Sequence, residues 1–361
     1  MKPYIAALIL FMNVSVYTDA QNLELQTVFS DSTYQLTGVA VSQSERVFTN
    51  YPRWSGPYRY ALVEVGENNT VKAYPDNEWN KWDVEKGGDK EKHFLCVQAV
   101  VIDNDDNMWV IDAGYAKNAE GDDKGQKLVK INLKTNKVEK VFPMDHIAGA
   151  GSYLNDMRID TQRQTGYITN SGEGGVLIVD LTTGQGRQVL LNKEVVKADT
   201  SYIMERNGKK LLSNAKPFHV HSDGIALSPD NSTLYFKSLT DDKLYRVATK
   251  YLNDPMLNDD ELASKVEYLG RYTTTDGMAF DPKGNLYLGD LELRRIIKLT
   301  PDLKIEEIIP PNEALAWPDS YHLTQDGWLY ISCSRIDEEA RFHDGINQRR
   351  GDYLIYKVKI D

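Results

Sequence analysis

Six polar residues stand at the same place in six similar segments of the chain. Each is followed by a short apolar run, a turn and a second strand-like run that carries an aromatic residue. They comprise three aspartates, two amides and one threonine: Thr37, Gln98, Asn155, Asp223, Asp276 and Asp319. Carboxylates brought close together repel one another and resist ionisation unless a positive charge lies among them. A proton, a metal ion or a cationic ligand would relieve that repulsion.

A hard divalent cation suits this set of donors, because Ca²⁺ takes six to eight oxygen ligands. Zinc would prefer histidine or cysteine, which are missing from these six positions. We therefore predict a divalent cation, most simply Ca²⁺, with Asn155, Asp223, Asp276 and Asp319 as its ligands. Two other interpretations stay open. The polar residues would line a water-filled channel, or the Asp-Gly pairs would only make turns before strands.

Other residues are candidates for contact with a substrate. His221 precedes Asp223 by two residues, and we expect His221 or Asp276 to move a proton. Substrate contacts are predicted for Tyr153, Arg158, Gln98 and Thr37. A histidine in a loop more often serves only as a hydrogen-bonding group, and packing is the common role of a tyrosine or arginine on a strand. The chain has no Gly-x-Ser-x-Gly elbow, Walker loop or paired-cysteine motif.

The elements that must position these residues are repeated units of about four strands. A repeat of this size indicates the blades of a propeller, whose first strands line a central channel. The predicted blades cover residues 35–75, 97–142, 153–192, 222–269, 275–310 and 318–360. The last blade is short of strands unless residues 23–29 join it, which would close the ring by pairing the two chain ends. We predict an all-β, six-bladed propeller formed by one domain, residues 21–361, with helical or irregular stretches at 191–205 and 253–265.

Composition narrows the partners and the location. The chain has 42 basic and 53 acidic residues, a net charge of −11, which argues against nucleic acid or an anionic membrane as partner. Lys2, an apolar stretch and small residues up to Ala20 are typical of a signal peptide covering residues 1–20. We therefore expect a secreted or periplasmic protein that is not membrane-bound after cleavage. We also expect it to be a monomer. Cys96 and Cys333 either form a disulfide or are two buried thiols.

With these residues in place, the chain resembles the Yellow and major royal jelly protein family. The matching stretches run through nearly the whole mature chain: residues 36–42, 50–54, 109–114, 154–156, 222–228 and 317–319. The resemblance implies a secreted six-bladed propeller. Members of that family are diverse: some are linked to dopachrome conversion, some bind small amines and some have nutritive roles.

A more distant resemblance is to the gluconolactonase and senescence marker family of calcium-dependent lactonases. It implies that Asp223 and Asp276 stand where that family has an asparagine and an aspartate as metal ligands, and Asn155 where it has a substrate-side asparagine. The family's first-blade glutamate falls on Thr37, and an arginine two residues before its asparagine falls on Tyr153. Both departures weaken the expectation of plain lactonase chemistry.

Three functions remain open from the sequence. The first is an enzyme acting on a small cyclic substrate, by lactone hydrolysis or dopachrome-type tautomerisation, at a cation in the channel. The second is a non-catalytic protein that binds a small molecule such as an aromatic amine. The third is a propeller that presents a protein-interaction face.

Overall fold

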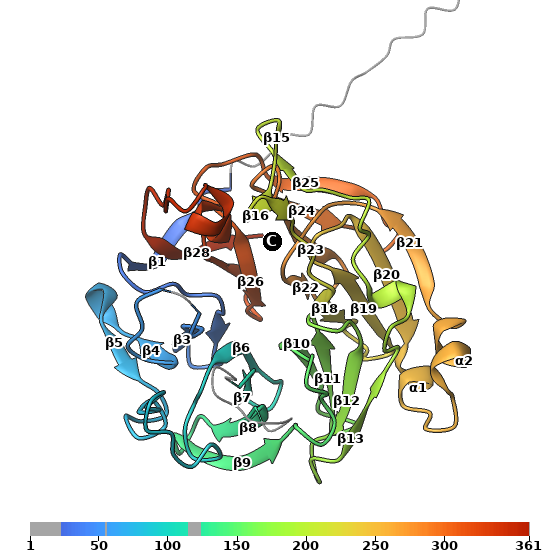
Figure 1. Ribbon diagram of the computed structural model, residues 1–361, viewed down its shortest axis with the longest axis horizontal. Coiled ribbons are helices and arrows are strands. Elements are labelled where there is room, and N and C mark those ends of the chain that lie inside the picture. Colours follow the sequence, from blue (N-terminus) through green and yellow to red (C-terminus); the bar gives the residue numbers. More distant parts are fainter. Residues whose placement is uncertain (1–22, 55, 115–123, 361) are drawn as a thin grey trace, which may run out of the picture.

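The chain forms six four-stranded antiparallel sheets arranged around a central axis (Figure 1). A computed structural model describes residues 23–54, 56–114 and 124–360. The strands of the first three blades are β2 (Ala40–Val41), β3 (Val47–Asn50), β4 (Leu62–Val65) and β5 (Val71–Ala73); β6 (Val97–Ile102), β7 (Asn107–Asp112), β8 (Lys127–Asn132) and β9 (Lys137–Pro143); and β10 (Leu154–Asp160), β11 (Thr165–Asn170), β12 (Val176–Asp180) and β13 (Gly186–Val189).

The other three blades continue the same order from the axis outward. Their strands are β18 (Ser222–Leu227), β19 (Thr233–Ser238), β20 (Lys243–Ala248) and β21 (Glu267–Arg271); β22 (Met278–Phe280), β23 (Leu286–Asp290), β24 (Arg295–Leu299) and β25 (Ile305–Ile309); and β26 (Pro318–Leu323), β27 (Trp328–Cys333), β28 (Tyr353–Lys359) and β1 (Gln26–Asp31). All six predicted blades are confirmed, and each observed blade lies within a few residues of its predicted range.

The two ends of the chain close the ring. Strand β1 pairs with β28 in antiparallel register, from Gln26 opposite Lys357 to Asp31 opposite Tyr353. Figure 1 shows the blue β1 beside the red β28. The predicted closure is therefore confirmed, and the pairing covers an edge that would otherwise expose unpaired backbone groups.

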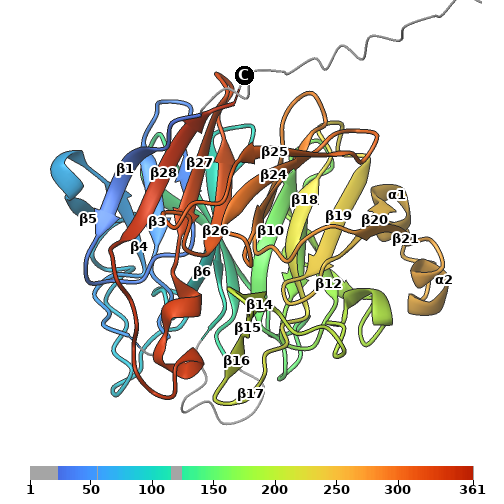
Figure 2. The ribbon, with the colours of Figure 1, turned by 90° about the horizontal axis from the view of Figure 1, so that it is seen from above.

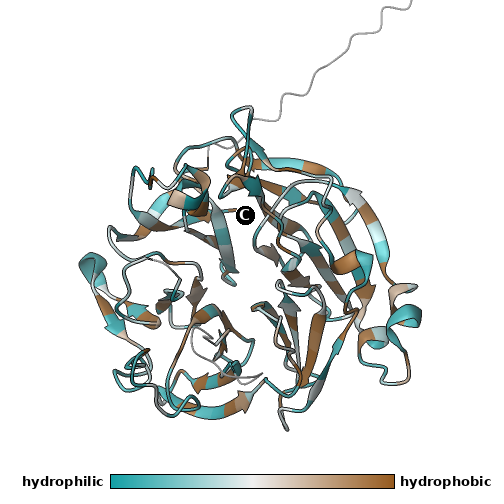
Figure 3. Ribbon diagram, in the orientation of Figure 1, coloured by the Kyte–Doolittle hydropathy of each residue, from teal (hydrophilic) through white to brown (hydrophobic). Residues whose placement is uncertain are grey.

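The hydrophobic core lies between neighbouring blades. Between the second and third blades, for example, Trp109, Ile111 and Leu128 pack with Leu154 and Ile168. Strands in the middle of a blade are buried on both faces, as β7 and β23 are along nearly their whole length, because each blade packs against two neighbours. Figure 3 shows hydrophobic and hydrophilic residues mixed around the ring. This packing fixes the inner strands and thereby the side chains that face the axis.

The short helices and small hairpins lie outside the blade sheets. The predicted irregular stretches contain α2 (Asp259–Ala263) and the 3₁₀ turn η2 (Glu194–Val196), whereas α1 (Thr249–Leu252) ends just before the second stretch begins. The other 3₁₀ turns are η1 (Glu67–Asn69), η3 (Ile336–Glu338) and η4 (Ala340–Phe342). Two hairpins, β14 (Glu205–Arg206) with β15 (Lys209–Lys210) and β16 (Leu212–Ser213) with β17 (Lys216–Pro217), lie at one end of the propeller, and the C-terminus lies at the other (Figure 2).

Within the described residues, every helix is too short and too polar to cross a membrane. Cys96 and Cys333 are both buried and both free thiols, so the alternative of a disulfide is not realised. The predicted signal peptide, residues 1–20, lies outside the described residues.

Candidate functional site

A break in strand register turns the predicted polar residues toward the axis. The pairing of inner strand with second strand shifts between Val97 and Ala99 in the second blade and between Leu154 and Met157 in the third. The same shift occurs on β18 and β26, so that Gln98, Asn155, Asp223 and Asp319 all lie at a bulge. A bulge re-aims a side chain that regular pleating would bury between blades. Asp276 lies just before β22 and needs no bulge.

These residues form the floor of a cavity of about 410 Å³ at one end of the channel. Five of the six predicted ring members line it, and they come from five successive blades: Gln98, Asn155, Asp223, Asp276 and Asp319. The walls add apolar and aromatic side chains, namely Trp54, Tyr153, Phe218, Val220, Leu239, Trp317 and Ile336. The cavity therefore combines an acidic floor with aromatic walls.

A chain of hydrogen bonds crosses the floor from blade to blade. Trp54 Nε1 donates to the hydroxyl oxygen of Tyr153 at 2.9 Å, and that hydroxyl donates to Gln98 Oε1 at 2.7 Å. Gln98 Nε2 donates to Asn155 Oδ1 at 2.8 Å. Asn155 Nδ2 then donates to Asp223 Oδ2. Each amide thus uses both its oxygen and its nitrogen within the chain, which fixes its orientation.

The chain ends on a pair of buried carboxyl groups. Asp223 and Asp276 are hydrogen-bonded to each other, which requires a proton on one of them. On the far side, Trp317 Nε1 donates to Asp276 Oδ2 at 2.7 Å. Burial raises the pKa of both carboxyl groups, and the contact with Asp276 raises that of Asp223 further, so the pair binds its shared proton more readily than a free aspartate does.

Burial disfavours charge at all three aspartates of the floor. Burial, followed by the Asp276 charge, raises the pKa of Asp223 well above its usual value. Burial raises the pKa of Asp276 to about 7, although the hydrogen bond from Trp317 opposes this shift. Burial and then the Asp276 charge also raise the pKa of Asp319. Near neutral pH the floor thus holds fewer negative charges than carboxyl groups.

The donor types suit a hard cation, but their arrangement does not form a cation cage. Asn155 offers its nitrogen, not its oxygen, to Asp223, because Gln98 already occupies the oxygen. In the described part of the chain, no three histidine, cysteine, aspartate or glutamate side chains are grouped closely enough to hold a metal ion. As arranged, a shared proton reduces the negative charge of the Asp223–Asp276 pair, and the buried Lys237 lies near enough to both carboxyl groups to offset part of the rest.

Three predicted site residues lie elsewhere. Thr37 is buried, where its hydroxyl accepts from Asn50 Nδ2 at 2.8 Å, and it does not line the cavity. His221 Nδ1 accepts a hydrogen bond from the backbone of Ala198 at 3.1 Å, and its ring is also outside the lining. Arg158 lines a different cavity, at the other end of β10. Blade one thus contributes Trp54 in place of Thr37.

The aromatic walls were missed by reasoning from the repeat, and what marks Trp317 is a backbone conformation that the sequence does not show. Trp317 comes two residues before the predicted ligand Asp319, and its backbone φ is 59°. A bulky residue rarely adopts this left-handed conformation, which costs free energy and is found mostly at functional sites. Here it points the indole at Asp276. Phe218 comes from the long segment between the third and fourth blades, and Ile336 from the loop between β27 and β28 of the sixth blade; the repeat makes no prediction for either.

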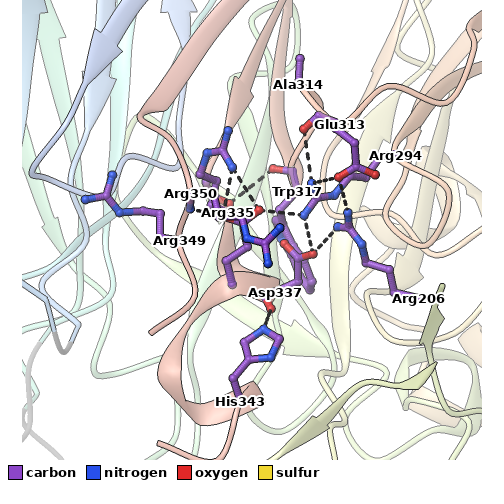
Figure 4. A network of polar contacts seen from close by, with 12 residues as sticks. Arg206, Arg294, Glu313, Ala314, Trp317, Arg335, Asp337, His343, Arg349 and Arg350 are labelled. Carbon is purple, nitrogen blue, oxygen red and sulfur yellow. Dashed lines mark hydrogen bonds and ion pairs between the residues drawn. The ribbon is translucent and has the colours of Figure 1, made fainter. Parts of the chain in front are cut away.

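An ion-pair network holds the loop that covers one side of the cavity (Figure 4). The side chain of Arg294, only 6% exposed, pairs with Asp337 Oδ2 at 2.8 Å and with Glu313 Oε2 at 2.7 Å. Arg206 reaches the same two carboxylates from the β14–β15 hairpin. Because Ile336, Glu339 and Arg341 of the cavity belong to the loop 334–352, the network fixes that wall in place.

Comparison with solved structures shows the same fold. The chain superimposes on a gluconolactonase from Xanthomonas campestris with a TM-score of 0.56 and 12% identity, covering 95% of this chain and 91% of that one. A calcium-binding protein, regucalcin, from Agrobacterium tumefaciens gives a TM-score of 0.53 and 16% identity, with 92% and 94% covered. At such low identity these likenesses establish the propeller architecture alone.

Sequence comparison is more specific. Major royal jelly protein 3 of Apis mellifera is 26% identical over 234 residues, 61% of this chain and 39% of the relative. The Yellow-related salivary protein LJM17 of Lutzomyia longipalpis is 23% identical over 303 residues, 74% and 69% of the two chains. The alignments span only 39, 55 and 44% of the length of royal jelly proteins 3, 7 and 6. The model of the family "Major royal jelly protein" matches residues 95–307, more than half of the chain, and the chain therefore belongs to the major royal jelly protein family.

Proposed function

We propose that this chain is an exported propeller that binds a small aromatic amine in the channel cavity, with the ammonium group against Asp223 and Asp276. The observation that carries the proposal is the acidic floor beneath aromatic walls. An ammonium ion can replace the shared proton as the neutralising charge, while Trp54, Trp317 and Phe218 offer π faces to its ring and its charge. Export is supported by relatives named for royal jelly and for saliva.

The geometry predicts how such a ligand sits. Asp276 is held by Trp317 on one side and Asp223 on the other, so its charge is fixed in direction before the ligand arrives. The hydrogen-bonded amides Gln98 and Asn155 are likewise oriented beforehand. A site arranged in advance loses little conformational freedom on binding. Binding of a cation should release the proton of Asp223, because a nearby positive charge lowers the pKa of a carboxyl group.

Isothermal titration calorimetry with phenethylamine tests the proposal, and 2-phenylethanol serves as the neutral isostere. We expect phenethylamine to bind and 2-phenylethanol not to bind, and the buffer should take up the proton that binding releases. Asp223→Asn should weaken the affinity for phenethylamine about tenfold or more, because it removes a charge-assisted contact. Asp105→Asn, which changes an exposed aspartate, is the matched control and should leave affinity unchanged. Equal binding of the alcohol, or an unaffected Asp223→Asn variant, would contradict the proposal.

A second candidate is catalysis, favoured by one specific feature. A carboxyl pair that shares a proton, with the pKa of Asp276 at about 7, holds both a base and an acid at neutral pH. In a dopachrome-type tautomerisation, Asp276 would take a proton from carbon and Asp223 would give one to the carbonyl oxygen. In lactone hydrolysis, Asp276 would take a proton from water as the water oxygen attacks the carbonyl carbon, and Asp223 would protonate the departing ring oxygen. His221, turned to Ala198, has no part in this scheme.

Product analysis separates the two candidates. Dopachrome and glucono-δ-lactone are incubated with the wild type and with Asp276→Asn, which keeps the acceptor for Trp317 but not the base. Turnover lost in that variant supports catalysis, whereas tight amine binding without product supports binding alone. The predicted Ca²⁺ needs its own test, because a calcium-binding protein shares this fold. If Ca²⁺ competes with the proton for Asp223 and Asp276, then adding Ca²⁺ after chelation will raise the melting temperature of the wild type but not that of Asp276→Asn.

A further inference from the structure

A second cavity, of about 460 Å³, lies at the opposite end of the channel. The inner strands begin at the acidic floor and end beside this second cavity. For example, β10 contributes Asn155 to the acidic cavity and Arg158 to the second cavity. On β26 the corresponding residues are Asp319 and His322. Three residues of strand span about 10 Å. The two cavities share no lining residue and are separate sites.

Arg158 and His322 face this cavity from opposite sides of the ring, on the third and sixth blades. The Arg158 guanidinium donates to the carbonyl oxygens of Met157 and Met278, so it is held across the channel. The imidazole of His322 makes no hydrogen bond to any residue that the structure describes. Burial, followed by the Arg158 charge, lowers the pKa of His322 to about 4, so the ring is neutral and has one N–H to donate.

The positive charge of Arg158 is poorly compensated. Its nearest acidic partner is Asp156, with Nη1 to Oδ2 at 3.6 Å, well beyond a charge-assisted hydrogen bond of about 2.8 Å. The two carboxylates of the lining serve the outer turns: Asp103 accepts from Trp109 Nε1, and Asp281 from Asn285. The cavity therefore holds a guanidinium whose one carboxylate partner is distant and an imidazole with a free donor.

We propose that this cavity is a binding site for a small organic carboxylate, with the carboxylate between Arg158 and His322 and the apolar body against Val100, Phe280 and Leu323. A guanidinium matches the planar geometry of a carboxylate and binds it through two oxygens. The apolar part of the lining offers the body of an organic acid a contact that a bare inorganic anion cannot make. Since the protein carries a net charge of −11, general attraction of anions does not account for binding at this place.

Calorimetry with benzoate at neutral pH tests the site, with benzyl alcohol as the neutral analogue and inorganic phosphate as the bare oxyanion. We expect benzoate to bind more tightly than either, and Arg158→Gln to weaken it about tenfold or more. Arg341→Gln is the matched control, because Arg341 lines the acidic cavity at the other end. Circular dichroism and the melting temperature show whether each variant is folded.

A second measurement does not depend on the arginine variant. The ring signals of His322 in the NMR spectrum of the wild type, assigned with His322→Gln, should shift on addition of benzoate and stay in place with benzyl alcohol. The proposal is overturned if benzoate fails to bind at about 10 mM, the range of the weakest specific ligands. It is also overturned if phosphate or the alcohol binds equally well, if Arg341→Gln is the variant that loses binding, or if the His322 signals do not move.

Discussion

Replacing Asp276 by asparagine should remove a large, pH-dependent contribution to the stability of the folded protein. The folded state raises the pKa of this carboxyl from 3.8 to about 7, mainly by burial. Between these values the folded protein holds a proton that the unfolded chain has lost. Stability is therefore highest at acidic pH and falls as the pH rises from about 4 to about 7, after which this contribution is constant.

The size of the effect follows from the shift. A difference of roughly three pH units, at about 1.4 kcal/mol each, corresponds to about 4 kcal/mol of unfolding free energy lost by pH 7 and above. Asparagine has the same shape, keeps an oxygen for Trp317 Nε1 and cannot ionise. Asp276→Asn should thus be more stable than the wild type by up to about 4 kcal/mol in mildly alkaline buffer, and nearly equal to it near pH 4.

Urea unfolding, followed by fluorescence in chelator-treated buffers across this pH range, measures the difference between the two proteins. Subtracting the variant from the wild type removes the contributions of the titrating groups that do not interact with Asp276, so the difference reports Asp276 together with its effect on Asp223 and Asp319. The exposed Asp105→Asn serves as control and should give a difference near zero at every pH. A wild-type advantage that is flat, or that grows with pH, would refute the inference that a proton neutralises the pair.

Three further predictions concern the surroundings of the floor. Trp317→Phe removes the hydrogen bond that lowers the pKa of Asp276, so the midpoint of the pH-dependent stability loss should move upward, measured by the same unfolding series. Arg294→Gln removes one of the two guanidinium groups that pair with the buried Asp337 and should cost about 2 kcal/mol of stability, with faster proteolysis within the loop 334–352, detected by mass spectrometry. Burial raises the pKa of both thiols to about 12, so Cys96 and Cys333 should resist alkylation in the native protein and both should react in denaturant. Failure of both cysteines to react in denaturant until a reductant is added would show a disulfide and contradict this prediction.

The repeat in the sequence was sufficient to predict the fold because its period is set by the backbone. Each blade begins with a polar residue and an apolar run, and this pattern recurs from Thr37 to Asp319 whatever the loops contain. The closing strand was also predictable, since the sixth blade lacked one strand and an alternating run near residue 26 supplied it. These inferences rest on periodicity and on satisfying strand edges, both of which are local properties.

The site was predictable only in part, because side chains at equivalent positions of the repeat do not all point in the same direction. Asn155 and Asp223 reach the channel through bulges, which the sequence does not announce. Thr37 occupies the same position in the repeat but turns its hydroxyl to Asn50. Arg158 lies only three residues from Asn155, yet that distance carries it to the other cavity. The walls from Phe218 and Ile336 depend on loop conformations that no periodicity encodes.

The resulting site is an arc and not the ring that the repeat suggests. Carboxyl groups come from blades four, five and six, amides from blades two and three, and an indole from blade one. The hydrogen bonds run along this arc and end at Asp276, where the indole of Trp317 blocks further extension. A symmetric ring of oxygens would favour a centrally placed spherical ion, whereas an arc with acid at one end and aromatic side chains around it favours an elongated ligand with a cationic end. The asymmetry that Thr37 introduces in blade one is consequently a determinant of what the channel can bind.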